Sequence, residues 1–211
     1  MTHELLRAEV LGAAHALLAA GLTIGHSGNV SARLGGTGGH VLLAITPHGR
    51  YYDELAPHDV IVMNETGAPM EGKGLPPTEW LLHVAVYHAR PDVNAVIHAH
   101  PPMGSAMAVV GQPIPPILED QLTFLGGQIK VAPHAATGSE ELARCAVETL
   151  DGRNACLLAN HGVLTVGKDL KAALVACQYL EKLAVAFLYA TFAGRVNVLS
   201  SSDQDRRGAQ G

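Results

Sequence analysis

The sequence predicts an α/β fold in which helices cover a sheet that is at least partly antiparallel. Segments with apolar residues at helical spacing are interspersed with short apolar runs of strand length along the chain. These segments do not follow the strict strand–helix–strand order of a parallel sheet, so some neighbouring strands are expected to run antiparallel. Hydrophobic residues make up 48% of the 211 residues, which is enough for one domain with a sizeable core.

Five segments are expected to be helical. In the first, leucine, valine and alanine recur at helical spacing. The second follows two prolines, with Thr78 as its expected N-cap, and Ser139 and Asp169 are expected to cap the last two. The helical segments are 3–20, 78–90, 103–111, 139–150 and 169–192.

Short apolar runs bounded by glycine, proline or polar residues predict six strands. They are 41–46, 60–64, 94–100, 129–133, 155–160 and 162–167. The glycine- and serine-rich segment 25–36 is expected to be a turn. We expect one domain over residues 1–198, followed by a flexible polar tail over residues 199–211.

The charge pattern argues against nucleic acid and membrane as partners. The formal net charge is −5, so there is no basic footprint for nucleic acid. The first ten residues carry charges and lack the apolar core of a signal peptide, and Glu181 and Lys182 interrupt the longest apolar run. The three cysteines are far apart and are expected to be reduced core residues. A cytoplasmic protein is therefore predicted.

Two histidines interrupt the apolar run VIHAHPP. Side chains two residues apart on a strand share a face, so His98 and His100 project together, either as metal ligands or as ordinary packing residues. His161 lies between two apolar strands at a tight Asn-His-Gly turn, where the glycine permits close approach. Three neutral imidazoles with a fourth position open are typical of a catalytic metal site. The histidines of the second helix, His83 and His88, are expected to pack or to face solvent.

Five motifs resemble the class II aldolase/adducin family, over roughly residues 5–195. They are SGNVSAR (27–33), ITPHG (45–49), LPPTEW (75–80), HARPDVNAVIHAHPP (88–102) and LLANHGVLTVG (157–167). The resemblance implies a three-layer α/β/α sandwich with a mostly antiparallel central sheet, and a homotetramer with active sites at subunit interfaces. It also implies that His98, His100 and His161 hold a zinc ion, although three imidazoles would accept manganese or cobalt.

Glu79, in LPPTEW, stands in the first turn of a predicted helix. Taken alone, it would be a surface carboxylate favoured by the helix dipole. The resemblance instead implies the acid/base that moves a proton on and off carbon. The reaction implied is reversible retro-aldol cleavage of a ketose 1-phosphate, similar to L-fuculose 1-phosphate, to dihydroxyacetone phosphate and an aldehyde. Cleavage leaves an enediolate, and a divalent ion that chelates its two oxygens stabilises the charge as a Lewis acid.

The resemblance implies a phosphate cradle that includes Gly28, Asn29, Gly49 and Thr78. Small residues let backbone N–H groups point at an anion, although SGN alone is more simply a turn. Two positions depart from the family's aldolases, because His48 replaces a hydroxyl residue and Pro77, which has no N–H, replaces a serine. The imidazole of His48 could still bind an anion.

The segment 113–127 lacks the tyrosine that protonates the leaving oxyanion in the family's fuculose-phosphate aldolases. Glu119 and Asp120 occupy this segment, either as the replacing acid or as solvated loop carboxylates.

These departures from the family's aldolases keep a second function open, a metal-dependent decarboxylase of a sugar acid or an aromatic carboxylate. The third reading is a structural module like adducin, which would have no reason to retain the three histidines and Glu79.

Overall fold

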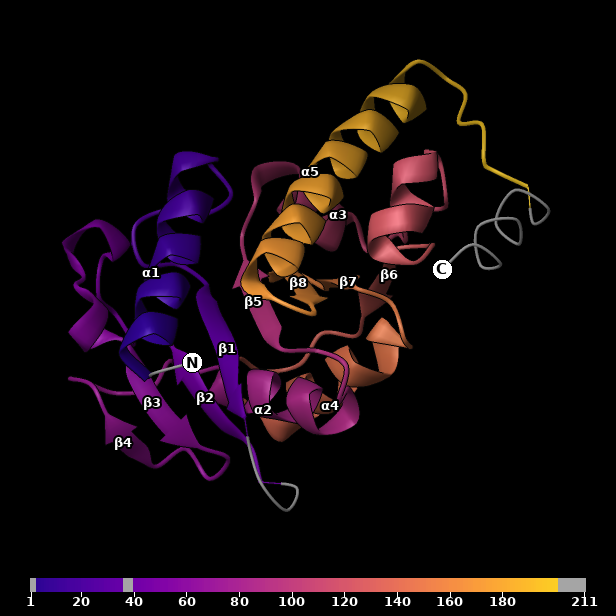
Figure 1. Ribbon diagram of the computed structural model, residues 1–211. Helices are drawn as coiled ribbons and strands as arrows, with labels where there is room; N and C mark the ends of the chain where they lie inside the picture. The colour runs from indigo at the N-terminus through magenta and orange to yellow at the C-terminus, as the bar shows by residue number, and fades with distance from the viewer. Residues whose placement is uncertain (1–2, 36–39, 201–211) are drawn as a thin grey trace.

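The computed structural model describes residues 3–35 and 40–200, which form one sheet with helices on both faces (Figure 1). The strands are β1 (Asn29–Gly35), β2 (Leu42–Ile45), β3 (Ile61–Asn64), β4 (Pro69–Glu71), β5 (Ala95–Ala99), β6 (Lys130–Ala132), β7 (Ala155–Leu158) and β8 (Gly162–Gly167). They lie in the order β4-β3-β2-β1-β5-β8-β7-β6. The β6–β7 pair is parallel and the other neighbours are antiparallel. The predicted sandwich with a mostly antiparallel sheet is confirmed.

The helices divide between the two faces of the sheet. They are α1 (His3–Ala19), α2 (Trp80–Ala89), α3 (Pro102–Val110), α4 (Glu140–Leu150) and α5 (Leu170–Phe192), with shorter helical turns at Tyr52–Glu54, Pro57–Asp59 and Gln121–Leu125. One apolar core lies under α1, α3 and α5, and a second lies under α2 and α4. Successive side chains of β5 point to opposite faces of the sheet, so β5 contributes residues to both cores. Ile97 belongs to the first core and Val96 to the second.

The strand β1 corrects the prediction of a turn over residues 25–36. Val30 and Ala32 are buried in the α1 core, as in any half-buried strand. The alternate residues, Asn29 and Ser31, are also buried, and they hydrogen-bond to side chains of α2. A strand with one apolar face and one small polar face has no clear hydrophobic run, and its glycine and serine neighbours favoured the turn. The strand β4 and the turn Gln121–Leu125 were also not predicted.

Two of the three predicted helix caps are present. The Ser139 hydroxyl accepts a hydrogen bond from the Leu142 N–H, and the Asp169 carboxylate accepts one from the Ala172 N–H. The prediction that Thr78 caps the second helix is wrong, because α2 begins at Trp80 and Glu79 occupies the N-cap position. The Glu79 carboxylate points towards the histidines of the sheet instead, as described below.

Within the described part of the chain, α5 is the one helix long and apolar enough to suit a membrane span by length and composition. Its buried residues pack in the core on the sheet. The charged residues near its middle are both engaged. Glu181 accepts hydrogen bonds from the N–H groups of Met103 and Gly104 at the start of α3, and Lys182 pairs with Asp120 at 2.9 Å. These contacts are those of a helix packed within a globular domain.

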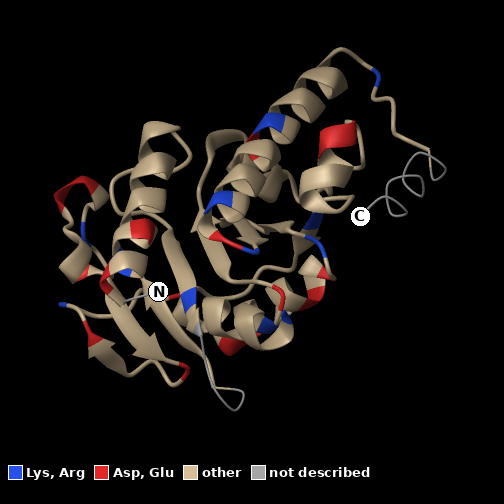
Figure 2. Cartoon of the chain, in the orientation of Figure 1, with Lys and Arg blue, Asp and Glu red and all other residues tan. Residues whose placement is uncertain are grey.

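Acidic and basic residues are interspersed over the helices and loops (Figure 2).

Most of the predicted polar tail, residues 201–211, lies outside the described residues. The tail's first residue, Leu199, donates a backbone hydrogen bond to the Pro116 carbonyl. The division into a domain and a tail therefore remains a prediction.

Candidate active site

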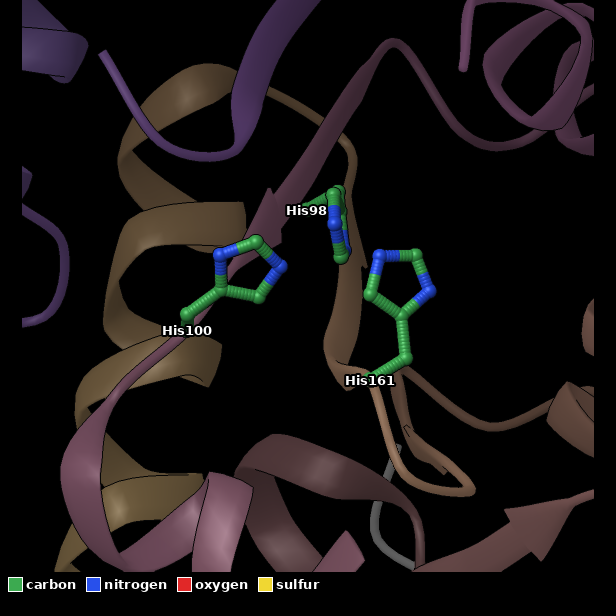
Figure 3. Close-up of side chains that lie close together, drawn as sticks. All are labelled: His98, His100 and His161. Carbon is green, nitrogen blue, oxygen red and sulfur yellow. The ribbon is translucent and has the colours of Figure 1, made fainter. Parts of the chain in front are cut away.

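Three histidines converge near the centre of the sheet, and their rings lie close together (Figure 3). His98 lies on β5, His100 follows the end of that strand, and His161 lies in the turn between β7 and β8. The ring centroid of His98 is 4.6 Å from that of His100 and 4.7 Å from that of His161. One ligand atom from each ring lies within 4.8 Å of the others, so the three imidazoles predicted from the sequence could hold one metal ion.

The Asn-His-Gly turn has the backbone that this convergence needs. Asn160 adopts a left-handed conformation, with φ of 56°, which asparagine tolerates better than most residues. A Cβ atom on Gly162 would lie 2.4 Å from Cδ2 of His100 and 2.6 Å from the carbonyl oxygen of Ala99. Only glycine allows this approach, as the sequence indicated.

Hydrogen bonds to the far ring nitrogens orient the two histidines of the β5 segment. Nδ1 of His98 lies 2.9 Å from the Val163 carbonyl oxygen, which can only accept, so Nδ1 carries the proton and Nε2 keeps its lone pair. Nδ1 of His100 lies 2.5 Å from the Ser27 hydroxyl. Burial lowers the pKa of His98 and lowers that of His100 to about 4. Both rings are therefore neutral at pH 7, the form that binds metal.

Glu79 joins the histidines from the N-terminus of α2. Its Oε1 lies 3.3 Å from Nε2 of His98 and 3.0 Å from Nε2 of His161, and its Oε2 accepts a hydrogen bond of 2.9 Å from the Asn29 amide. Burial alone would raise the pKa of this carboxyl, but His161, His98 and Asn29 together lower it to about 2. The carboxylate is therefore ionised at neutral pH and 7% exposed.

The donor set fits a divalent cation. Among the described residues, three buried atoms of this group have no hydrogen-bond partner: Glu79 Oε1, His98 Nε2 and His100 Nε2. An unpaired buried polar atom costs ~1–3 kcal/mol, so three at one point call for a common partner. Neutral imidazole nitrogens and a carboxylate oxygen are ligands that zinc, manganese and cobalt all accept. His98, His100 and His161 could hold such an ion, with Glu79 beside it.

The residues expected to cradle a phosphate differ in accessibility, and one of them, Asn29, begins β1 and does not lie in a loop. Gly28, with φ of 78°, packs so closely on β5 that a Cβ atom would lie 2.4 Å from the His98 carbonyl oxygen. The Asn29 amide is buried and engaged with Glu79 and His83. The exposed residues of the set are His48, Gly49 and Thr78.

The backbone ties two of these loops together. The His48 N–H donates to the Leu75 carbonyl at 2.9 Å, which joins the loop after β2 to the segment that leads into Glu79. Gly49 has φ of 64°, and Thr78 packs against Gly138. Within one chain, the carboxylate of the candidate acid Asp120 contacts Lys182 on α5, and Glu119 is exposed on the same loop.

The contacts of His83 with the residues of this site were not predicted from the sequence. His83 was expected to pack or to face solvent, and it packs, because it is fully buried and hydrogen-bonded to Asn29 and Ser31. A signal was present. Glu79, His83 and Tyr87 recur every four residues from the N-cap into α2, which puts three polar side chains on one buried face.

Comparisons with known proteins show the family and the fold of the chain. Residues 8–188 match the family described as the class II aldolase and adducin N-terminal domain. The chain belongs to the class II aldolase and adducin family. The aldolases among its relatives identify the chain as a lyase of the aldolase type.

Two relatives and one solved structure illustrate the similarity. The chain is 33% identical over 201 residues to a 5-methylthioribulose-1-phosphate/5-deoxyribulose-1-phosphate aldolase of Rhodospirillum rubrum, covering 95% of this chain and 88% of the relative. It is 36% identical over 168 residues to an L-fuculose phosphate aldolase of Escherichia coli, covering 80% and 75%. A solved L-fuculose 1-phosphate aldolase superposes with a TM-score of 0.91 at 31% identity, covering 97% of this chain and 95% of the other. Class II aldolases depend on a metal, and the histidine group is the corresponding candidate site.

Proposed function

We propose that this chain is a metal-dependent aldolase that cleaves a ketose 1-phosphate to dihydroxyacetone phosphate and an aldehyde, and also catalyses the reverse addition. The observation that carries the proposal is the buried Glu79 carboxylate beside three convergent imidazoles. The printed names of the relatives support the substrate class, because they include methylthioribulose 1-phosphate, deoxyribulose 1-phosphate and fuculose phosphate. These ketoses differ at the end distant from the phosphate.

The residues divide the chemistry between them. His98, His100 and His161 would hold the ion, zinc in our proposal, which supplies Lewis-acid stabilisation of the negative charge that develops on the substrate oxygens. Glu79 moves the proton at carbon. In the addition direction its ionised carboxylate removes a proton from C3 of dihydroxyacetone phosphate, and in the cleavage direction it returns that proton to C3 as the C3–C4 bond breaks. General acid/base help of this kind contributes ~10²–10⁴-fold.

A second acid/base has to work at the other end of the breaking bond. The C4 hydroxyl loses its proton as the aldehyde forms, and the C4 oxygen regains one on addition. We assign this step to Asp120 or Glu119 of a neighbouring subunit. A homotetramer with its sites at subunit interfaces would bring that loop to the histidines of the next chain. Exposed apolar residues on α3 and α5, namely Val109, Val110, Tyr189 and Phe192, support an interface between subunits.

The substrate phosphate would lie on the loops beside the metal group. Gly28, Gly49 and Thr78 offer backbone or hydroxyl donors, and the exposed imidazole of His48 offers a ring nitrogen. Asn29 would contribute through its backbone, since its side chain is engaged with Glu79 and His83. A cytoplasmic location is part of the same proposal, because sugar phosphates are found there.

The deciding experiment is the Glu79→Gln variant of the zinc-loaded enzyme. We expect its zinc content, measured by elemental analysis, to match wild type, and its release of aldehyde from ketose 1-phosphates to fall by at least ~10²-fold. Glu148→Gln is the matched control, because Glu148 is an exposed carboxylate that pairs with Arg144 on α4. Full activity of the Glu79 variant would remove this residue from the mechanism.

A decarboxylase is the second candidate, and the altered phosphate loops favour it. His48 and Pro77 replace two donors expected in a phosphate-binding aldolase, so the substrate could be a sugar acid or an aromatic carboxylate. Release of CO₂ from such acids, without an aldehyde product, would select this function. Mass measurement in solution tests the tetramer independently of either activity.

A further inference from the structure

A buried chain of hydrogen bonds leads away from Glu79 between α2 and β1. The Asn29 amide nitrogen donates to Glu79 Oε2 at 2.9 Å, and the Asn29 amide oxygen lies 2.5 Å from Nε2 of His83. Nδ1 of His83 lies 2.6 Å from the Ser31 hydroxyl, which lies 2.7 Å from the Tyr87 hydroxyl. These five side chains are all at most 7% exposed, and among the described residues they form one continuous path.

The orientation of the Asn29 amide fixes the direction of the other hydrogen bonds in this chain. Its NH₂ group donates to Glu79 Oε2, so its oxygen faces His83. That oxygen can only accept, so Nε2 of His83 carries the proton and Nδ1 is the acceptor. Ser31 then donates to Nδ1 and accepts from Tyr87. Burial lowers the pKa of His83 to about 3, so the ring stays neutral and keeps this single tautomer at working pH.

We propose that His83 is a positioning residue for the reaction, which acts through Asn29 to hold the Glu79 carboxylate in its working orientation. This inference rests on the aldolase function proposed above. Without the donor at Nε2, the Asn29 amide can turn over and present its oxygen to Glu79 Oε2, which repels the carboxylate. Oε1 then no longer points at the histidines, although the ligands themselves are unchanged.

A pair of amide substitutions separates positioning from simple packing. In His83→Gln the amide nitrogen can occupy the place of Nε2 and still donate to Asn29. In His83→Asn the shorter side chain reaches only the place of Nδ1, and the donor to Asn29 is lost. We expect His83→Asn to lower kcat by about 10–100-fold, with zinc content and KM near wild type, and His83→Gln to recover most of the loss.

Tyr87→Phe is the matched control within the same chain of hydrogen bonds. It removes the hydrogen bond between Tyr87 and Ser31, but Ser31 can still donate to His83, so the link to Glu79 is intact. We expect its kcat to stay near wild type. Equal losses in His83→Asn, His83→Gln and Tyr87→Phe would overturn the inference, since they would reflect general destabilisation, and so would full activity of His83→Asn.

A spectroscopic measurement tests the geometry without any assay of activity. In protein with ¹⁵N-labelled histidine, the zinc-loaded wild type is expected to show the neutral Nε2–H tautomer for His83, assigned by its absence in His83→Gln. The Nδ1–H tautomer or a charged ring at pH 7 would overturn the inference. If wild type cleaves no ketose phosphate while this tautomer is present, the proposed function fails and the inferred geometry stands.

Discussion

His83 should make the unfolding free energy of this protein depend on pH in a defined range. Its pKa is lowered from 6.5 to about 3, mainly because burial penalises the charged ring. In the unfolded chain the ring takes up a proton near its usual pKa, whereas in the folded chain it stays neutral. Unfolding therefore binds a proton between these two values, and stability is lost as the pH falls below about 6.5.

The size of this effect follows from the two pKa values. One pH unit is worth about 1.4 kcal/mol, so His83 costs the folded state about 2 kcal/mol at pH 5 relative to pH 7. Glutamine does not titrate, so His83→Gln should lose about 2 kcal/mol less than wild type over the same range. Urea unfolding of the metal-free proteins, followed by circular dichroism at pH 7, 6 and 5, measures the difference.

The control for this measurement is Tyr87→Phe, which perturbs the same buried contacts without removing an imidazole. Its stability should fall with pH in parallel with wild type. Parallel curves for wild type and His83→Gln would refute the reasoning, because they would mean that His83 either stays charged in the fold or remains accessible to protons there.

The remaining predictions concern the metal site, one helix cap and one loop carboxylate. Gly162→Ala places a methyl group against the His100 ring and should weaken zinc binding by about 10–100-fold in a chelator competition assay. Removing the metal with a chelator should lower Tm in calorimetry, because an ion at 100 times its Kd stabilises the fold by about 2.7 kcal/mol. Ser139→Ala should cost about 1 kcal/mol in urea unfolding by removing the cap of α4. The hydrogen bond from the Ala56 N–H lowers the pKa of Asp59, so the Tm deficit of Asp59→Asn should be largest at neutral pH and shrink as the pH falls below 4.

The sequence was sufficient for the parts of the molecule that follow local rules. Ser139 and Asp169 cap helices as expected, and the two-residue spacing of His98 and His100 and the Asn-His-Gly turn predicted a group of three histidines that could hold a metal ion. Local rules failed where buried polar residues form hydrogen bonds with residues far away in the sequence. In β1, Asn29 and Ser31 are buried because side chains of α2 complete their hydrogen bonds, and no property of the segment 25–36 alone indicates those partners.

Contacts between residues far apart in the sequence also explain why the start of α2 was predicted incorrectly. A threonine before a helix is a good cap in isolation, so Thr78 was the natural choice. In the fold, Glu79 takes the N-cap position with its carboxylate directed at the sheet, where the histidines of β5 and of the β7–β8 turn contact it. The Glu79 side chain contacts these histidines and makes no capping hydrogen bond at the helix end.

The order of the central strands has a consequence for which sugars would fit. The loop after β2, the start of β1, the end of β5 and the turn into β8 belong to four neighbouring strands of one hydrogen-bonded sheet. Adjacent strands are about 4.8 Å apart, so the sheet fixes the interval between the loop after β2 and the histidines. Under the proposed function, in which the substrate phosphate binds on that loop, this fixed interval would select the length of the phosphate-bearing end of the ketose and leave its other end free to vary.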